Sequence, residues 1–278
     1  MRDLKVATWN VHRRRECLYE VFADDTVDVL AVQEVPASGR KKDAPGSPGH
    51  WKLWGGGRAA LYINKRWNRT EWAPVMIEKD VVAAKVGDTH ILSIYSEGFS
   101  TSWTTPLDTL LAMTPLPRPI VVGDFNLHHP LWDKEERTGP GVEKLLELAV
   151  AWDLSLATPK GEPTWESQGR RQSTLDLIWF GAETMTRYEG AADWARSDHY
   201  PQLVTVRSGA QPQRRERRPD WSLMRGDEVA AGAEKALSGR FWGATTVADL
   251  DIAAEMLIET LQRLRDATVP LKGAGRGL

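Results

Sequence analysis

The hydrophobic positions in the first two-thirds of the chain form short apolar runs separated by turn-forming residues. Several of these runs are continuous and do not alternate with polar residues, which indicates strands that are covered on both faces. Clusters of Gly, Pro, Asn and Asp between the runs predict turns. The predicted strands cover residues 4–9, 27–33, 58–64, 80–86, 90–95, 119–123, 174–180 and 202–206.

Segments with helical spacing of apolar residues lie between the predicted strands. Residues 15–23 form one segment, and residues 105–113 form another, with Pro106 near its start, where proline is tolerated. In residues 140–152 the apolar side chains form one stripe, which predicts a helix that packs on the core. The stripe consists of Val142, Leu145, Leu146, Ala149 and Trp152. Strands with interleaved helices predict an α/β or α+β layered domain, which we expect to span residues 1–208.

The composition changes near residue 208. Residues 209–220 contain an arginine cluster and predict a basic linker, which either contacts phosphates or is simply solvated. Residues 221–278 predict a helical tail. The apolar spacing over residues 247–268 indicates an amphipathic helix that ends before Pro270. This helix would pack on the main domain, on a second copy or on a continuation of the chain.

Composition and charge place the chain among ordinary globular proteins. Hydrophobic residues make up 41% of the chain, charged residues 27%, and the net charge is −2, so any surface that binds nucleic acid must be local. The single cysteine, Cys17, excludes an intrachain disulfide, and no pattern of a secretion signal is visible. No run reaches the ~18 apolar residues that a membrane span needs. We therefore expect a protein that is neither secreted nor embedded in a membrane.

Polar side chains with catalytic potential follow or begin many of the predicted strands. Because a layered domain gathers distant strand ends into one cleft, we expect these side chains to meet. Asp124 and Asn126 are two positions apart and should point the same way, while Phe125 points into the core. The candidate site residues are Asn10, Glu34, Tyr95, Asp124, Asn126, Asp176, Asp198 and His199.

The chemistry of these candidates favours a hard metal ion and hydrolysis of a phosphate ester. Glu34 follows an apolar strand and would be costly to bury without a partner, which a cation would supply. Oxygen ligands suit Mg²⁺, or Mn²⁺ in its place, and not zinc. His199 can take a proton from water, Asp176 can hold the imidazole tautomer, and Asn126 can donate to a developing oxyanion. Each residue alone also has a purely structural explanation, so the prediction depends on the complete set.

The order of the motifs resembles the endonuclease/exonuclease/phosphatase superfamily, which is DNase I-like. The resemblance covers about residues 3–207, and the run from Gly123 to Asp133 is most similar to the endonuclease domain of non-LTR retrotransposons. It implies a four-layer α/β/β/α sandwich with the site at one edge of the paired sheets. The motifs that carry it are WN (9–10), QE (33–34), Tyr95, GDFN (123–126), LDLIW (175–179) and SDH (197–199).

The resemblance also implies a role for each candidate metal ligand. Glu34, with help from Asn10, holds Mg²⁺. Asp198 either orients His199 or contributes to a second metal position. Whether one or two metal ions bind stays open.

For the remaining candidates the resemblance implies roles in the reaction itself. Asp176 and His199 form the acid–base pair, Asp124 and Asn126 bracket the attacking water and the oxyanion, and Tyr95 contacts the phosphate. Whether His199 or Asp124 is the general base stays open.

The implied activity is Mg²⁺-dependent nicking of DNA that leaves a 3′-hydroxyl able to prime reverse transcription. In such elements a reverse transcriptase follows in a longer polyprotein, which would place the protein in the nucleus; otherwise we expect the cytoplasm. Two alternatives stay open: a phosphatase or phosphodiesterase for a small-molecule, lipid or RNA substrate, and a decayed, non-catalytic binding module. His128 and His129 either contact DNA or support their loop. The sequence does not fix the oligomeric state.

Overall fold

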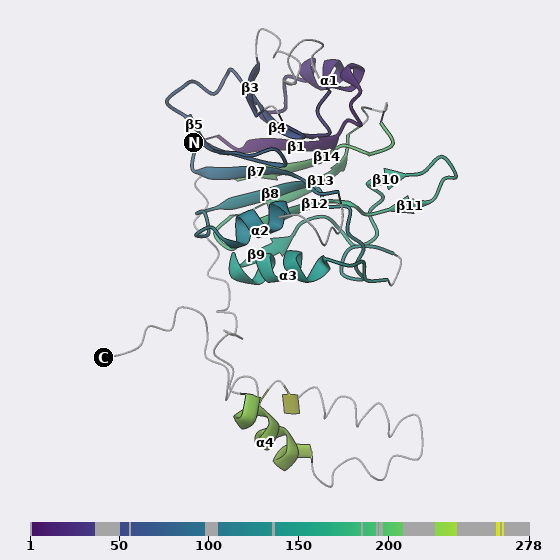
Figure 1. Ribbon diagram of the computed structural model, residues 1–278. Coiled ribbons are helices and arrows are strands. Elements are labelled where there is room, and N and C mark those ends of the chain that lie inside the picture. Colours follow the sequence, from purple (N-terminus) through teal and green to yellow (C-terminus); the bar gives the residue numbers. More distant parts are fainter. Residues whose placement is uncertain are drawn as a thin grey trace. The chain divides into compact units, whose positions relative to one another are not determined.

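Figure 1 shows a computed structural model of the chain, which divides into two compact units, Met1–Gln213 and Arg214–Leu278. The structure describes residues 2–36, 51–55, 57–97, 105–134, 137–184, 186–192, 194, 197–207, 226–237, 260, 261 and 263.

The first unit is built around two six-stranded sheets. The first sheet has parallel β1 and β2 at its centre, and its other neighbours are antiparallel. Helix α1 (Arg15–Phe22) connects β1 to β2 and packs on the outer face of this sheet, where Cys17 is buried. The strand order is β13 (Thr186–Ala191), β14 (Gln202–Val206), β1 (Leu4–Asn10), β2 (Val29–Gln33), β4 (Ala59–Asn64) and β3 (Trp51–Gly55).

The second sheet places parallel β7 and β8 at its centre. Helices α2 (Pro106–Leu111) and α3 (Val142–Ala151) lie side by side on its outer face. A separate hairpin, β10 (Trp165–Glu166) and β11 (Gln172–Ser173), extends from one end of the unit (Figure 1). The strand order is β5 (Trp72–Ile77), β6 (Val81–Val86), β7 (Thr89–Tyr95), β8 (Pro119–Asp124), β12 (Asp176–Gly181) and β9 (Leu154–Leu156).

The inner faces of the two sheets bury one shared apolar core. Val6 and Val29 of the first sheet belong to the same buried cluster as Val82, Ile91 and Ile120 of the second. With α1 outside one sheet and α2 and α3 outside the other, the layers run α/β/β/α (Figure 1). The predicted four-layer sandwich is confirmed. Burial of the apolar runs on both faces explains why they lack polar alternation.

Gly123 lets β8 approach β7 closely enough to aim the next residue at the site. Its φ is +145°, and a Cβ placed there would lie 1.9 Å from the carbonyl oxygen of Ile94. In the β7–β8 register Gly123 pairs with Ile94, and Asp124 pairs with Tyr95. The glycine of the GDFN motif is therefore a packing requirement.

All eight predicted strands are present, but several further strands had no clear signal. Strand β5 contains Pro74, and its register shifts between Pro74 and Met76; it lies at a sheet edge with most residues exposed. Strand β13 alternates between exposed and half-buried positions, also at an edge. Edge strands tolerate proline and polar residues, so they lack the apolar run that identified the central strands. In α3 the buried face includes Leu148, which the predicted stripe omitted. Helix α2 packs alongside α3.

The second unit contains α4 (Gly226–Leu237). Residues 260, 261 and 263 are helical, but most of the amphipathic helix predicted over 247–268, like the basic linker 209–220, lies outside the described residues. None of the helices in the described part of the chain has the length and apolar character that crossing a membrane requires.

Candidate active site

Five strand ends meet at one edge of the sandwich. Parallel β1 and β2 end together, with Asn10 opposite Gln33. Parallel β7 and β8 also end together, with Tyr95 opposite Asp124. Strand β12 runs antiparallel to β8 and begins at Asp176, directly opposite Asp124. This topology brings together residues that are far apart in the sequence. For example, the Trp9 indole donates to the carbonyl of His199, 190 positions away.

His199 lies between two buried carboxylates. Its Nδ1 is 2.8 Å from Oδ2 of Asp176, and its Nε2 is 3.9 Å from Oδ2 of Asp124. All three residues are at most 5% exposed. Because Asp176 accepts at Nδ1, the imidazole presents Nε2 toward Asp124, which is the orientation of an acid–base pair.

The two carboxylates strongly affect proton binding at this cluster. Burial raises the pKa of Asp124, and the like charge of Asp176 raises it further, to about 7, although His199 opposes the shift. Burial lowers the pKa of His199, but the attraction of Asp176, with Asp124 and Asp198, outweighs this effect and raises it to about 9. In the metal-free protein, these charges therefore favour a protonated His199, and they make Asp124 a stronger base than an ordinary aspartate.

Asn10 links this cluster to Glu34. Its Nδ2 donates to Oδ2 of Asp124 at 2.8 Å and to Oε1 of Glu34 at 3.1 Å. Its Oδ1 accepts the backbone N–H of His12 at 2.9 Å. Turning the amide over would place its oxygen against two carboxylates, so Asn10 supplies donors here and its oxygen is engaged by the protein. Asn10 thus contacts both carboxylates, and its predicted help in holding a metal ion stays a prediction.

Glu34 also accepts a hydrogen bond from Tyr95, whose hydroxyl is 3.2 Å from Oε1. Burial and the charges of Glu34 and Asp124 raise the pKa of Tyr95, which therefore remains a hydroxyl donor. The guanidinium of Arg13, mostly exposed, is 3.6 Å from the other Glu34 oxygen. The backbone of Glu34 has a φ of +48°, which is strained for a non-glycine residue and typical of functional positions.

Asn126 is placed as a support for Asp124. Its Nδ2 donates to Oδ2 of Asp124 at 3.0 Å and to the carbonyl of Ser96 at 2.7 Å, and its backbone N–H donates to Oδ1 of Asp124 at 3.0 Å. Both amide hydrogens are thus engaged, so the predicted donation to an oxyanion would require one of these bonds to open. Phe125, which lies between Asp124 and Asn126 in the sequence, is fully buried, as the strand alternation predicts.

Asp198 lies at the rim. Its side chain is 33% exposed, and Oδ1 is 3.3 Å from Nδ1 of His12. The indole of Trp165 donates to the other oxygen at 3.4 Å. Asp198 does not hydrogen-bond the imidazole of His199 in the structure, so it affects that ring by charge. Sequence reasoning did not include His12 and Trp165 in the site, although the position of His12, two residues after the WN motif, is a usable signal.

These groups surround a cavity of about 470 Å³. Asn10 and Asp176 lie behind its wall, while the other predicted residues line it. The lining also includes basic residues that sequence reasoning did not assign to the site. The complete lining is His12, Glu34, Tyr95, Asp124, Asn126, His128, Arg137, Trp165, Arg171, Ser173, Leu175, Asp198 and His199.

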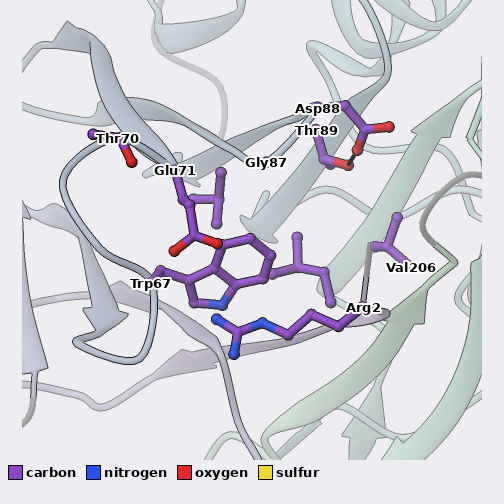
Figure 2. Close-up of a pocket in the computed structure, with 10 residues that line it drawn as sticks. Arg2, Trp67, Thr70, Glu71, Gly87, Asp88, Thr89 and Val206 are labelled. Atoms are coloured by element: carbon purple, nitrogen blue, oxygen red, sulfur yellow. Dashed lines mark hydrogen bonds between the residues drawn. The ribbon is translucent and has the colours of Figure 1, made fainter.

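Figure 2 shows a second cavity, of about 560 Å³. It is lined by Leu4 and Thr89, the first residues of β1 and β7, and so lies at the opposite ends of these strands from the site. Arg2 stacks over the Trp67 ring at 4.1 Å there. Its acidic groups are engaged: Asp88 lies 3.4 Å from Arg118, and Glu71 accepts a backbone N–H. The lining has no histidine and no adjacent carboxylate pair, so the larger cavity does not offer the chemistry of the smaller one.

Comparisons with known proteins agree with this architecture. Residues 89–203 match a family described as Endonuclease-reverse transcriptase. The endonuclease domain of TRAS1, a telomere-specific non-LTR retrotransposon, is 16% identical, with 74% of this chain and 98% of that chain covered and a TM-score of 0.53. These matches support the resemblance to the endonuclease/exonuclease/phosphatase superfamily. The predicted resemblance is confirmed.

Two other solved structures from this superfamily are less similar. An endonuclease/exonuclease/phosphatase family protein from Leptotrichia buccalis C-1013-b is 15% identical, with 74% of this chain and 100% of that chain covered and a TM-score of 0.48. The inositol polyphosphate 5-phosphatase domain of SpSynaptojanin is 14% identical, with 96% and 92% covered and a TM-score of 0.46. No curated protein matched the chain.

The residues present fit the divalent metal ion that this superfamily uses. The ligand atoms of Asp124, Asp176 and His199 lie within 4.8 Å of one another, and Oδ1 of Asp176 is buried without a hydrogen-bond partner among the described residues. Glu34 lines the cavity with a carboxylate that accepts from the Asn10 amide and the Tyr95 hydroxyl. Such oxygen-rich groups suit Mg²⁺ or Mn²⁺.

Proposed function

We propose that this protein is a Mg²⁺-dependent endonuclease that hydrolyses phosphodiester bonds in DNA. The observation that carries the proposal is the position of His199, whose Nδ1 lies 2.8 Å from Asp176 and whose Nε2 faces Asp124. These groups share a cavity with Glu34. A paired imidazole, an adjacent carboxylate and a separate carboxylate for a cation are the parts that metal-assisted hydrolysis needs.

The proton affinities favour Asp124 as the general base. A pKa of about 7 leaves much of Asp124 ionised at neutral pH and close to the optimum for accepting a proton from water. His199, with a pKa of about 9, carries a proton that it can direct toward a phosphate oxygen. Asp176 keeps His199 charged and oriented. The water oxygen bonds to phosphorus while Asp124 takes one of its protons. The bond from phosphorus to the 3′ oxygen breaks, and that oxygen takes a proton from solvent, which leaves a 3′-hydroxyl and a 5′-phosphate.

Glu34 is the residue we assign to the metal ion, with Asn10 holding its carboxylate in place. Mg²⁺ bound there would neutralise negative charge on the phosphate and on the leaving oxygen. Asp198 at the rim is available for a second ion. Tyr95 lines the cavity, and its hydroxyl would donate to a phosphate oxygen in place of Glu34.

DNA is the substrate that we infer. Arg137 and Arg171 line the cavity beside the acidic groups, which suits an anionic substrate held around a bound cation. The matched family description and the TRAS1 domain support a retrotransposon setting. In that setting a reverse transcriptase domain would act with this one, and nicking would occur in the nucleus.

The test is nicking of supercoiled plasmid by the purified chain with Mg²⁺, compared with Glu34→Ala and His199→Ala. We expect wild type to convert supercoiled to open-circular DNA, and both variants to lose the activity. Equal nicking by all three proteins would contradict the proposal. A parallel assay of phosphate release from inositol phosphates addresses the phosphatase alternative, because release of phosphate without DNA cleavage would replace the proposed substrate.

A further inference from the structure

A second histidine–carboxylate pair lies at the rim of the same cavity and has no part in the chemistry above. Nδ1 of His128 is 2.5 Å from Oδ2 of Asp133, and Nε2 is 2.7 Å from a terminal nitrogen of Arg137. The Asp133 carboxylate is almost completely buried, the His128 side chain is 21% exposed, and Arg137 is exposed. Both His128 and Arg137 line the cavity.

The hydrogen-bond partners of His128 determine which of its ring nitrogens carries the hydrogen. A guanidinium can only donate, so Nε2 of His128 accepts from Arg137, and Nδ1 carries the hydrogen that is donated to Asp133. The three groups therefore run from a buried anion through a neutral imidazole to an exposed cation. Asp133 fixes the imidazole ring, and the ring fixes the direction of one guanidinium N–H.

The backbone around His128 is held in place as well. Its carbonyl accepts the N–H of Gly139 at 2.8 Å, and the N–H of Asp133 donates to the carbonyl of His129 at 2.9 Å. The buried indole of Trp132 donates to the carbonyl of Leu127 at 2.9 Å. A histidine needed only to close this loop would not require its second nitrogen to face an arginine at the cavity.

We propose that Arg137, oriented by His128 and Asp133, binds a phosphate next to the one that is cleaved, so that the site selects a polynucleotide over an isolated phosphate ester. The inference rests on the proposed function and deepens it. The guanidinium presents a planar fork of N–H donors that suits two phosphate oxygens at once. Arg171, which also lines the cavity, places a second positive charge there. Arg137 is the binding residue, and His128 and Asp133 are positioning residues.

Binding to DNA as a function of salt concentration tests the inference. Fluorescence anisotropy with a labelled duplex, in Ca²⁺ to prevent cleavage, would compare wild type with Arg137→Ala, Arg137→Lys and His128→Phe. The control is Arg69→Ala, which removes an exposed arginine from the turn between β4 and β5. We expect Arg137→Ala to weaken binding about tenfold and to reduce the slope of log K against log salt by about 0.9, the value of one phosphate contact. Arg137→Lys should keep the slope and bind more weakly, and His128→Phe should weaken binding through Arg137.

A second measurement separates phosphate binding from loop folding. Bis(4-nitrophenyl) phosphate is a diester with no neighbouring phosphate, so a damaged loop would reduce its hydrolysis and DNA nicking alike. We expect Arg137→Ala to reduce nicking about tenfold more than it reduces hydrolysis of this diester. Equal losses on both substrates, or an unchanged salt slope in a variant that still nicks DNA, would overturn the inference and leave the proposed function intact. Absence of nicking by wild type would overturn both.

Discussion

The imidazole of His199 and the carboxylate of Asp176 form a hydrogen bond of 2.8 Å that is almost completely shielded from water. The two residues are 23 positions apart and reach each other because β12 begins where the SDH segment passes the sheet edge. At this depth, a charged imidazole depends on its carboxylate partner.

Replacement of Asp176 should therefore lower the rate of the reaction more than it lowers the stability of the fold. We predict that Asp176→Asn lowers the single-turnover rate of plasmid nicking by roughly 10²- to 10⁴-fold, because an amide neither holds the imidazolium nor fixes its tautomer. The control is Asp25→Asn, an exposed carboxylate in the turn before β2. A rate for Asp176→Asn within a few-fold of wild type would remove Asp176 from the reaction.

The proton on His199 can be followed directly. In metal-free protein we predict that ¹H–¹⁵N NMR finds the imidazole charged until the pH nears 9, because three carboxylates face it. In Asp176→Asn the titration should move to lower pH, since the strongest attraction is gone. Titration of wild-type His199 at an ordinary value, near 6.5, would show that the carboxylates do not control the ring.

The same proton affinities predict how stability depends on pH without metal. Folding raises the pKa of Asp124 from 3.8 to about 7, so its contribution is full below pH 3.8 and is lost as pH rises through 7. Folding raises the pKa of His199 from 6.5 to about 9, so its contribution is full below pH 6.5 and is lost as pH rises through 9. We therefore predict that the free energy of unfolding, measured with urea in EDTA, has a component that falls as the pH rises from about 4 to about 9.

Asp124→Asn provides the matched variant for that measurement. It removes the buried carboxylate that resists ionisation. The free energy of unfolding should therefore fall less between pH 5 and pH 7, and nicking should be lost. Addition of Mg²⁺ should restore stability to wild type at high pH, since a cation favours the ionised carboxylates. An identical pH profile for wild type and variant would mean that Asp124 ionises freely.

Much of the fold follows from the sequence because the central strands are buried on both faces. Their continuous apolar runs, such as Ile120 to Val122, identify them without any knowledge of the pairing. The edge strands could not be identified in this way. Pro74 interrupts the β5 ladder, and the exposed positions of β13 carry residues that also occur in loops. Their strand conformation comes from the neighbour to which each is hydrogen-bonded, which only the assembled sheet supplies.

The sequence predicted that the candidate residues lie close together, but it did not predict their contacts. Each candidate stands at a strand end, and topology brings such ends together. The sequence could not reveal that the Asn10 amide lies between Glu34 and Asp124, or that both amide hydrogens of Asn126 are engaged. These details depend on side-chain rotamers and on backbone strain at Glu34 and Asn126, which have positive φ. The Asp133–His128–Arg137 chain was missed because it lies within one irregular loop.

Substitutions at two glycines with positive φ distinguish the effect of a steric clash on stability from the effect of backbone strain. We predict that Gly123→Ala lowers the free energy of unfolding by more than about 4 kcal/mol, because its Cβ would meet the Ile94 backbone at 1.9 Å. At Gly190, φ is +92° but a Cβ would meet nothing within 4 Å. Gly190→Ala should therefore lower the free energy of unfolding only by the energy of the backbone strain, about 1–3 kcal/mol. Urea unfolding measures both, and similar losses would show that the β7–β8 approach is looser than described.

The Mg²⁺ dependence of plasmid nicking tests the central claim most directly. Wild type, Glu34→Gln and the control Glu147→Gln, an exposed helix residue, would be assayed across a Mg²⁺ titration and in EDTA. We predict that wild type and the control nick only with metal, and that Glu34→Gln needs at least about tenfold more Mg²⁺ or is inactive. Nicking by Glu34→Gln at the wild-type rate and Mg²⁺ requirement, or nicking by wild type in EDTA, would contradict the account.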